Sequence, residues 1–211
     1  MILYGSPTSP FVRRVRVSCL ELDLPFDAVD VFQADGQARL RAITPLWKVP
    51  VVQYPDGQVQ WDSEAILGSL QQHAGPGPFR AIQDPVRESN IHHAIVGALE
   101  SAINVFYLRR DGVDTDSIPY MQKQNERVDA ALAWVASQLH GDTFLDADAA
   151  LTAGGFGPLE LTLFCTLDWL RFREVRPVEQ VPAFAEFLAA HQERPSLVAT
   201  HPSRPFVSHA G

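Results

Sequence analysis

The sequence has few cysteines, and their spacing argues against both a disulfide-stabilised domain and a zinc site. The 211 residues include only Cys19 and Cys165. A disulfide-stabilised secreted domain has several cysteines at close spacing, and a zinc site needs a CxxC pair or a His/Cys cluster. The neighbouring His92 and His93 have no third ligand at metal spacing. We therefore expect no metal ion and a reduced, cytoplasmic location.

The chain also lacks long apolar runs and an excess of positive charge. No stretch approaches the roughly 20 apolar residues of a membrane span, and the first residues do not have the basic and then apolar pattern of an export signal. Lys and Arg number 17 against 25 Asp and Glu, which gives a net charge of −8. Phosphate backbones are bound by clustered positive charge. We therefore expect neither a membrane nor a nucleic acid as partner.

What the sequence does have is the composition of a globular protein, with 46% hydrophobic and 20% charged residues. Residues 75–78 read Gly-Pro-Gly-Pro, which neither a helix nor a strand can cross. The hydrophobic pattern changes at this point. We predict one domain over residues 1–76, a linker over 77–84 and a second domain over 85–211.

The first half alternates short strands with helices, which predicts a mixed α+β domain. Strands are predicted from apolar runs and flanking turn residues over residues 1–4, 26–32, 49–54 and 58–61, the last two joined by an Asp-Gly hairpin turn. Helices are predicted from apolar residues at helical spacing over residues 11–22 and 63–73.

The second half has only helical patterns. An apolar stripe at helical spacing extends from Ile91 to Phe106, and shorter stripes begin at Val128 and Phe184. Between them, residues 157–160 read Gly-Pro-Leu-Glu, with Gly at the N-cap, Pro at the first helical position and Glu at the third. We predict an all-α domain.

Two segments at helix starts could bind a ligand, and each also has a simpler structural interpretation. Ser9 precedes Pro10 and fits a helix N-cap, but a hydroxyl at a helix N-terminus also favours an anion. Asp62 and Ser63 would cap the next helix. They could equally hold an α-amino acid group, with Ser63 binding its carboxylate and Asp62 its ammonium.

A third segment, residues 48–50, enters the third predicted strand with the sequence Lys-Val-Pro. From these residues alone we expect a trans bond before Pro50, because cis is about 5–6% of such bonds. A cis bond would turn the backbone of Val49 outward, where it could pair with an extended peptide.

The order of these segments resembles the glutathione S-transferase family over essentially the whole chain. The matching stretches are residues 6–15, 44–51, 62–66 and 157–161. The resemblance is greatest to bacterial serine-type members (zeta-like or theta-like). It implies a thioredoxin-like N-terminal domain, an all-helical C-terminal domain and a homodimer.

The resemblance also assigns roles to single residues. Ser9 corresponds to the hydroxyl that bonds the glutathione sulfur, although Ser6 and Thr8 are near enough to compete. The residues that correspond to the rest of the glutathione site are Lys48 for the glycyl carboxylate, Val49 and the cis-proline Pro50 for the cysteinyl part, and Asp62 and Ser63 for the γ-glutamyl group. Trp47 departs from the family, which usually has Gly there, as do Gly157 and Glu160, where it has Ser or Thr and then Asp.

The electrophile pocket of the family is formed mainly by the second domain. Tyr107, Arg110 and Trp169 are the candidates here, because aromatic residues beside an arginine could hold an apolar or anionic substrate. Phe106 continues the apolar stripe, so we assign it to packing. The three arginines of the first predicted helix are expected to form a solvated face or to make salt bridges at a dimer interface.

The activity that follows is that of a detoxifying glutathione transferase, with glutathione as co-substrate. The enzyme would activate the glutathione thiol for attack on an electrophilic small molecule, or use it to reduce organic peroxides. The alternative is a non-catalytic binding or regulatory protein with the same fold. A thiol-disulfide reductase ranks last, since it needs a cysteine near position 9.

Overall fold

The computed structural model describes residues 1–146 and 155–211, and its contacts divide the chain into two units. The first unit combines Met1–Pro78 with Gln192–Gly211, and the second is Phe79–His191. The sequence groups residues 192–211 with the helical half, whereas in the structure they pack with the first unit. Arg194 pairs there with Glu21 at the end of helix α1 (Pro10–Glu21), at 2.7 Å.

The first unit is built on a mixed four-stranded sheet with the order β2-β1-β3-β4. The strands are β1 (Ile2–Gly5), β2 (Asp27–Asp30), β3 (Val51–Gln53) and β4 (Val59–Gln60). β1 is parallel to β2 and antiparallel to β3, so Tyr4 lies opposite both Val29 and Val51. Helix α1 connects the two parallel strands, which need such a crossover. This confirms the predicted mixed α+β unit.

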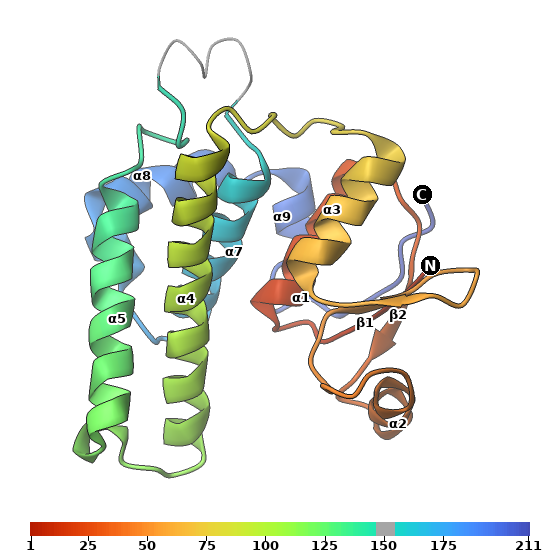
Figure 1. The fold of residues 1–211 in the computed structure, drawn as a ribbon, viewed down its shortest axis with the longest axis horizontal. Coiled ribbons are helices and arrows are strands. Elements are labelled where there is room, and N and C mark those ends of the chain that lie inside the picture. Colours follow the sequence, from red (N-terminus) through yellow and green to blue (C-terminus); the bar gives the residue numbers. More distant parts are fainter. Residues whose placement is uncertain (147–154) are drawn as a thin grey trace. The chain divides into compact units, whose positions relative to one another are not determined.

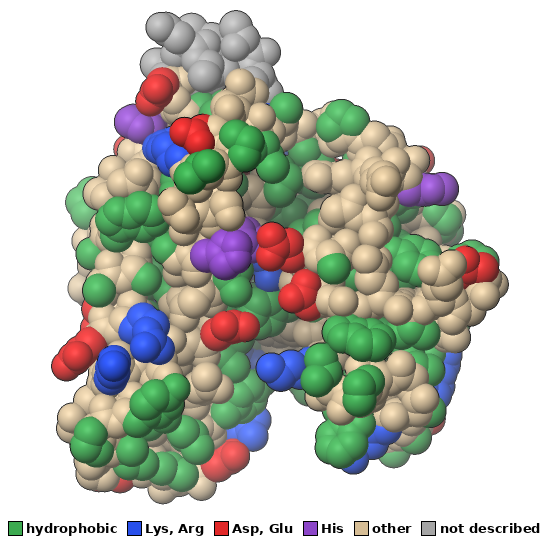
Figure 2. All heavy atoms as spheres, viewed as in Figure 1, with side chains coloured by type: hydrophobic (Ala, Val, Ile, Leu, Met, Phe, Trp, Pro, Cys, Tyr) green, Lys and Arg blue, Asp and Glu red, His purple; other side chains and the backbone are tan. Residues whose placement is uncertain are grey.

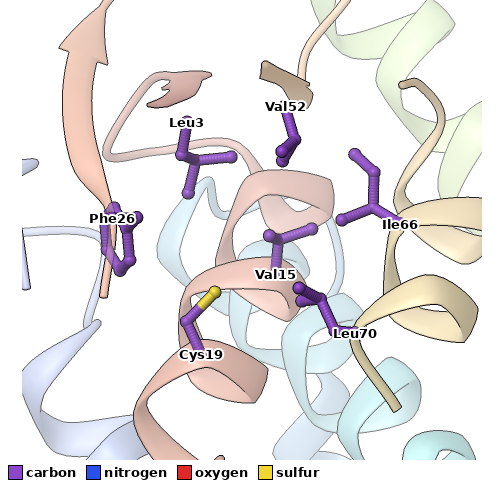
Figure 3. Close-up of a cluster of buried hydrophobic side chains, with 7 residues drawn as sticks. All are labelled: Leu3, Val15, Cys19, Phe26, Val52, Ile66 and Leu70. Carbon is purple, nitrogen blue, oxygen red and sulfur yellow. The ribbon is translucent and has the colours of Figure 1, made fainter. Parts of the chain in front are cut away.

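Helices cover both faces of this sheet (Figure 1). Helices α1 and α3 (Ser63–Ala74) pack on each other and on one face, where alternate strand residues point. The residues of this core are Leu3, Val15, Cys19, Phe26, Val52, Ile66 and Leu70 (Figure 3). The other face carries Tyr4 and Val51 and is covered by Leu40 of helix α2 (Ala34–Ile43).

The C-terminal segment, residues 192–211, packs along α1 and ends beside β2. Its short helix α9 (Pro195–Ala199) is held by Arg13 of α1, whose Nη2 donates to the Leu197 carbonyl at 2.9 Å. Further on, Phe26 and His209 exchange two backbone hydrogen bonds of 2.9 Å each. The segment therefore pairs with the chain just before β2 and covers part of the sheet edge.

The described part of the second unit is helical, as predicted. Its elements are α4 (Pro85–Arg110), α5 (Pro119–Ala136), α7 (Pro158–Phe172), α8 (Pro182–His191) and the short 3-10 helices η1 (Thr115–Ser117) and η2 (Val178–Gln180). Helix α4 packs against both α5 and α7 (Figure 1). The buried residues of α4 include Ile91, Ile95, Ala98 and Leu99, which belong to the predicted stripe.

Helix α4 is also long and apolar enough to cross a membrane, judged by length and composition alone. Its most apolar 18-residue window has a mean hydropathy of 1.2. The central helix of a helical domain meets the same criterion, because one of its faces is buried against its neighbours. The packing of α4 on α5 and α7 fits this explanation.

Helix α7 begins in a buried ion-pair network. Glu160, which is fully buried, accepts hydrogen bonds from Nε and Nη2 of Arg80 at 2.9–3.1 Å and from the N–H of Gly157 at 2.9 Å. A Cβ atom on residue 157 would lie 2.6 Å from Cγ of Arg80. The position of Arg80 therefore explains why Gly, and not Ser or Thr, is the N-cap here.

Candidate functional site

The predicted site residues of the first unit come together at one edge of its sheet. Tyr4, near the end of β1, lies opposite Val51 of β3, so the antiparallel register brings residues 49–50 alongside the start of the loop after β1. This loop leads into α1. Helix α1 in turn contacts the start of α3, where Nη2 of Arg14 lies 2.7 Å from Oγ of Ser63. The three segments identified from the sequence are therefore neighbours.

Ser9 is the N-cap of α1. Its Oγ accepts a hydrogen bond of 3.3 Å from the N–H of Val12, and Pro10 takes the first helical position, as predicted. Accepting this bond leaves the hydroxyl proton of Ser9 available to an acceptor outside the helix. Ser6 is buried, and Thr8 is half-buried like Ser9.

The bond between Val49 and Pro50 is cis. The sequence alone favours trans, and the resemblance implies the cis form that the structure contains. Val49 is half-buried, and its backbone N–H and carbonyl have no hydrogen-bond partner within the residues that the structure describes. These two groups could pair with an extended peptide, as a sheet edge does.

Asp62 and Ser63 form the start of α3. Oδ1 of Asp62 caps the helix by accepting from the N–H groups of Glu64 and Ala65, at 3.0 and 3.2 Å. The exposed Asp62 still has its second carboxylate oxygen to offer. Within the described chain the N–H of Ser63 has no acceptor, so it is a free donor beside the Ser63 hydroxyl. Capping and ligand binding are thus compatible at this position.

The three arginines of α1 do not form a solvated face, so this expectation is wrong. Arg13, Arg14 and Arg16 are only 2–3% exposed. Arg13 and Arg16 donate to residues of the C-terminal segment, whereas Arg14 donates to Ser63. Helical spacing cannot show this burial, because it depends on where residues 192–211 and α3 pack.

Lys48 is exposed at the end of the loop that precedes β3. Its neighbour Trp47 has a φ of +53°, in the left-handed region that favours glycine. This conformation explains why the family that the chain resembles usually has Gly at this position. Trp47 is 53% exposed, and the centre of its ring lies 4.3 Å from the guanidinium carbon of Arg41. Figure 2 shows hydrophobic side chains at the surface around α2, next to basic ones.

The candidates for an electrophile pocket lie in the second unit and differ in exposure. Tyr107 is 43% exposed, and the guanidinium of Arg110 lies 4.6 Å from the centre of its ring. Trp169 is buried, and its ring lies 5.5 Å from that of Phe106. The centre of the Phe106 ring also lies 5.3 Å from the centre of the Tyr107 ring. A cavity of about 330 Å³ at the start of α4 is lined by none of these residues.

Neither cysteine offers a reactive thiol. Both are buried. The Cys19 sulfur points in among the apolar side chains of the core (Figure 3), and burial raises the pKa of this thiol to about 12. Since the thiolate is the nucleophilic form, the buried Cys19 is poorly suited to act as a nucleophile. Within residues 1–146 and 155–211 no cluster of three or more His, Cys, Asp or Glu side chains could hold a metal ion.

Comparison with known proteins relates the first unit to one family. Residues 3–78 match the family model described as the N-terminal domain of glutathione S-transferase. The chain is also 23% identical over 180 residues to the uncharacterized GST-like protein YibF of Escherichia coli K12, a match that covers 84% of this chain and 85% of YibF.

Solved structures extend the similarity to the whole chain. A glutathione S-transferase from Methylobacterium radiotolerans in complex with glutathione sulfonate is 22% identical with a TM-score of 0.80, covering 100% of this chain and 98% of its own. A glutathione transferase family member from Pseudomonas fluorescens Pf-5 with bound glutathione is 26% identical with a TM-score of 0.75, covering 96% and 99%. The chain therefore has the glutathione transferase fold, with a thioredoxin-like N-terminal part and a helical part.

Proposed function

We propose that this chain is a serine-type glutathione transferase that binds glutathione in its first unit and activates the glutathione thiol. The observation that carries this proposal is the start of α3, where two donors of Ser63 and a free carboxylate oxygen of Asp62 are available within two residues. This set matches an α-amino acid group, with its carboxylate at the helix N-terminus and its ammonium on Asp62. The relatives from M. radiotolerans and P. fluorescens, which hold glutathione sulfonate and glutathione, support the same ligand.

The rest of the tripeptide would follow the sheet edge. The cysteinyl backbone would pair with the N–H and carbonyl of Val49. Val49 precedes Pro50, and the bond between them is cis. The glycyl carboxylate would lie within reach of Lys48. This orientation would direct the cysteinyl sulfur toward the loop after β1, and so toward Ser9.

Ser9 would stabilise the thiolate. A free thiol with a pKa of about 8.5 is mostly protonated at pH 7. The Ser9 hydroxyl can donate to the sulfur, and the N-terminus of α1 favours the anion. Lowering the thiol pKa by about two units corresponds to roughly 2.7 kcal/mol. With a substrate that carries a leaving group, the thiolate would attack the electrophilic carbon and form a C–S bond as the leaving group departs. With an α,β-unsaturated carbonyl it would add to the β-carbon, and the α-carbon would take up a proton.

The second unit would supply the electrophile site through Tyr107, Arg110 and Trp169. With an organic peroxide as second substrate, two glutathione molecules would give one disulfide, an alcohol and water. We further propose that the protein is a cytoplasmic homodimer with a role in detoxification.

A turnover assay tests this function. Purified protein is given glutathione with a panel of aryl halides, α,β-unsaturated carbonyls and hydroperoxides, and the Ser9→Ala variant serves as control. We expect turnover on at least one class, strongly reduced in Ser9→Ala. Glutathione binding with no turnover on any class would favour the alternative, a non-catalytic binding protein.

A further inference from the structure

Arg14 links α1 directly to the start of α3. Its Nη2 donates to Oγ of Ser63 at 2.7 Å, and the two residues are 2% and 3% exposed. The guanidinium carbon also lies 5.0 Å from the centre of the Phe11 ring, which restricts the direction of the side chain. The bond therefore joins two side chains that are held in place by burial.

This bond determines what the Ser63 hydroxyl can do. A guanidinium has five N–H donors and no acceptor. Toward Arg14 the Ser63 oxygen can only accept, so its proton must point elsewhere. Accepting from a cation also polarises the O–H group, which strengthens it as a donor. The hydroxyl is thus oriented as a donor beside the N–H of Ser63, which has no acceptor within the described chain.

We propose that Arg14 is a positioning residue for the carboxylate of the γ-glutamyl group. It acts through Ser63, whose hydroxyl it orients, and its buried positive charge favours an anion at the same place. The inference rests on the proposed function. Since Arg14 holds Ser63 and not Ser9, it affects the binding of glutathione and leaves the reactivity of the bound thiol unchanged.

The neighbouring Arg13 provides a matched control. It lies on the same helix and is equally buried, but its bonds go to Leu197 and Thr200 of the C-terminal segment. Loss of Arg13 should destabilise the first unit and should affect the binding of all ligands equally. Loss of Arg14 should weaken only the binding of ligands that have the α-carboxylate.

The test compares glutathione with 4-aminobutyryl-cysteinylglycine, a glutathione analogue that lacks only the α-carboxylate. In Arg14→Met we expect the affinity for glutathione to fall about tenfold and KM to rise with it. The affinity for the analogue, kcat at saturation and the pH profile of kcat should stay unchanged. Arg14→Lys keeps the charge and should recover part of the loss. In a Ser63→Ala background, Arg14→Met should add little.

Several outcomes would overturn the inference. These are equal losses for both ligands, unchanged affinity in both Arg14 variants, a shifted pH profile, or a loss that adds in full to that of Ser63→Ala. If Arg14→Met does not fold, Arg14→Lys carries the same comparison, because it loses the forked donor and should weaken glutathione binding but not analogue binding. Failure of the unaltered protein to bind glutathione would instead contradict the proposed function itself.

Discussion

Asp62 and Asp84 begin their helices in the same way. Each accepts with Oδ1 from the N–H groups two and three residues later, at 3.0 and 3.2 Å for Asp62 and at 3.1 and 2.9 Å for Asp84. Both aspartates are exposed. They differ in what surrounds them, because only Asp62 is followed by a serine that Arg14 holds. Comparing variants of Asp62 and Asp84 therefore distinguishes a role in helix capping, which both share, from a role in ligand binding, which is proposed for Asp62 alone.

Asp62→Asn should weaken glutathione binding while preserving α3. Asn caps helices about as well as Asp, but it lacks the charge that would pair with the glutathione ammonium. We expect an affinity loss of about tenfold with an unchanged melting temperature, measured by calorimetry and circular dichroism. Asp84→Asn is the matched control and should leave both quantities unchanged. Equal affinity for glutathione in the two variants would remove Asp62 from the site.

Ser9→Ala should reduce turnover far more than Thr8→Ala. Without the Ser9 hydroxyl, the pKa of the bound thiol should rise toward its free value, and at pH 7 turnover should fall by roughly 10- to 100-fold. The pH profile of kcat measures this shift directly. Loss of the N-cap also costs about 1 kcal/mol of stability, so the assay is run well below the melting temperature. Equal losses in the two variants would contradict the choice of Ser9.

Glu160→Gln should strongly destabilise the second unit. Glu160 is buried and bonds to Arg80, Thr143 and the Gly157 N–H, so removal of its charge leaves the buried guanidinium of Arg80 with Glu88 as its remaining carboxylate partner. We expect a loss of about 3–5 kcal/mol in urea unfolding. Glu179, half-exposed and 3.4 Å from Arg171, is the control, and Glu179→Gln should cost less than about 1 kcal/mol. A similar loss of unfolding free energy in the two variants would show that burial of the Glu160 network contributes little to stability.

The ion pair between Glu21 and Arg194 should make the docking of the C-terminal segment depend on pH. Burial alone would raise the pKa of Glu21, but hydrogen bonds from Arg194 and Ser196 outweigh it and hold this pKa below its ordinary value of 4.5. A lowered carboxyl pKa stabilises the folded state above the unfolded pKa, and this stability is lost as the pH falls through the folded pKa.

Glu21→Gln should therefore cost about 1 kcal/mol at pH 7, and this cost should shrink as the pH falls below the ordinary Glu pKa of 4.5. Urea unfolding at several pH values measures both. The exposed Glu193, which precedes Arg194 in the chain, provides the control, and Glu193→Gln should show no such trend. A cost for Glu21→Gln that is the same at every pH would contradict the ion pair.

Much of the fold could be predicted from local patterns. The strands around Leu3 and Val52 and the stripe of α4 lie where apolar runs and helical spacing place them. The pattern does not predict helix α2, because its buried residues are only Gly36 and Leu40 and no apolar stripe marks it. A Cβ atom on residue 36 would lie 2.2 Å from the Asp30 carbonyl oxygen, so this glycine serves close packing that periodicity does not reveal.

The site can be predicted only in part for a similar reason. Ser9, Asp62 and Ser63 stand at helix starts, where sequence signals are strong. The contact between Arg14 and Ser63 joins residues 49 positions apart, and no local pattern marks it. The packing of residues 192–211 on the first unit is equally non-local, which is why helical spacing alone places the buried arginines of α1 in solvent.

The most direct test of the central claim is a calorimetric titration of the unaltered protein with glutathione. We expect saturable binding to one site per chain, with a Kd of about 1 mM or below. Ser63→Ala should weaken this binding. The absence of saturable heat at millimolar glutathione, with the protein folded, would contradict the central claim.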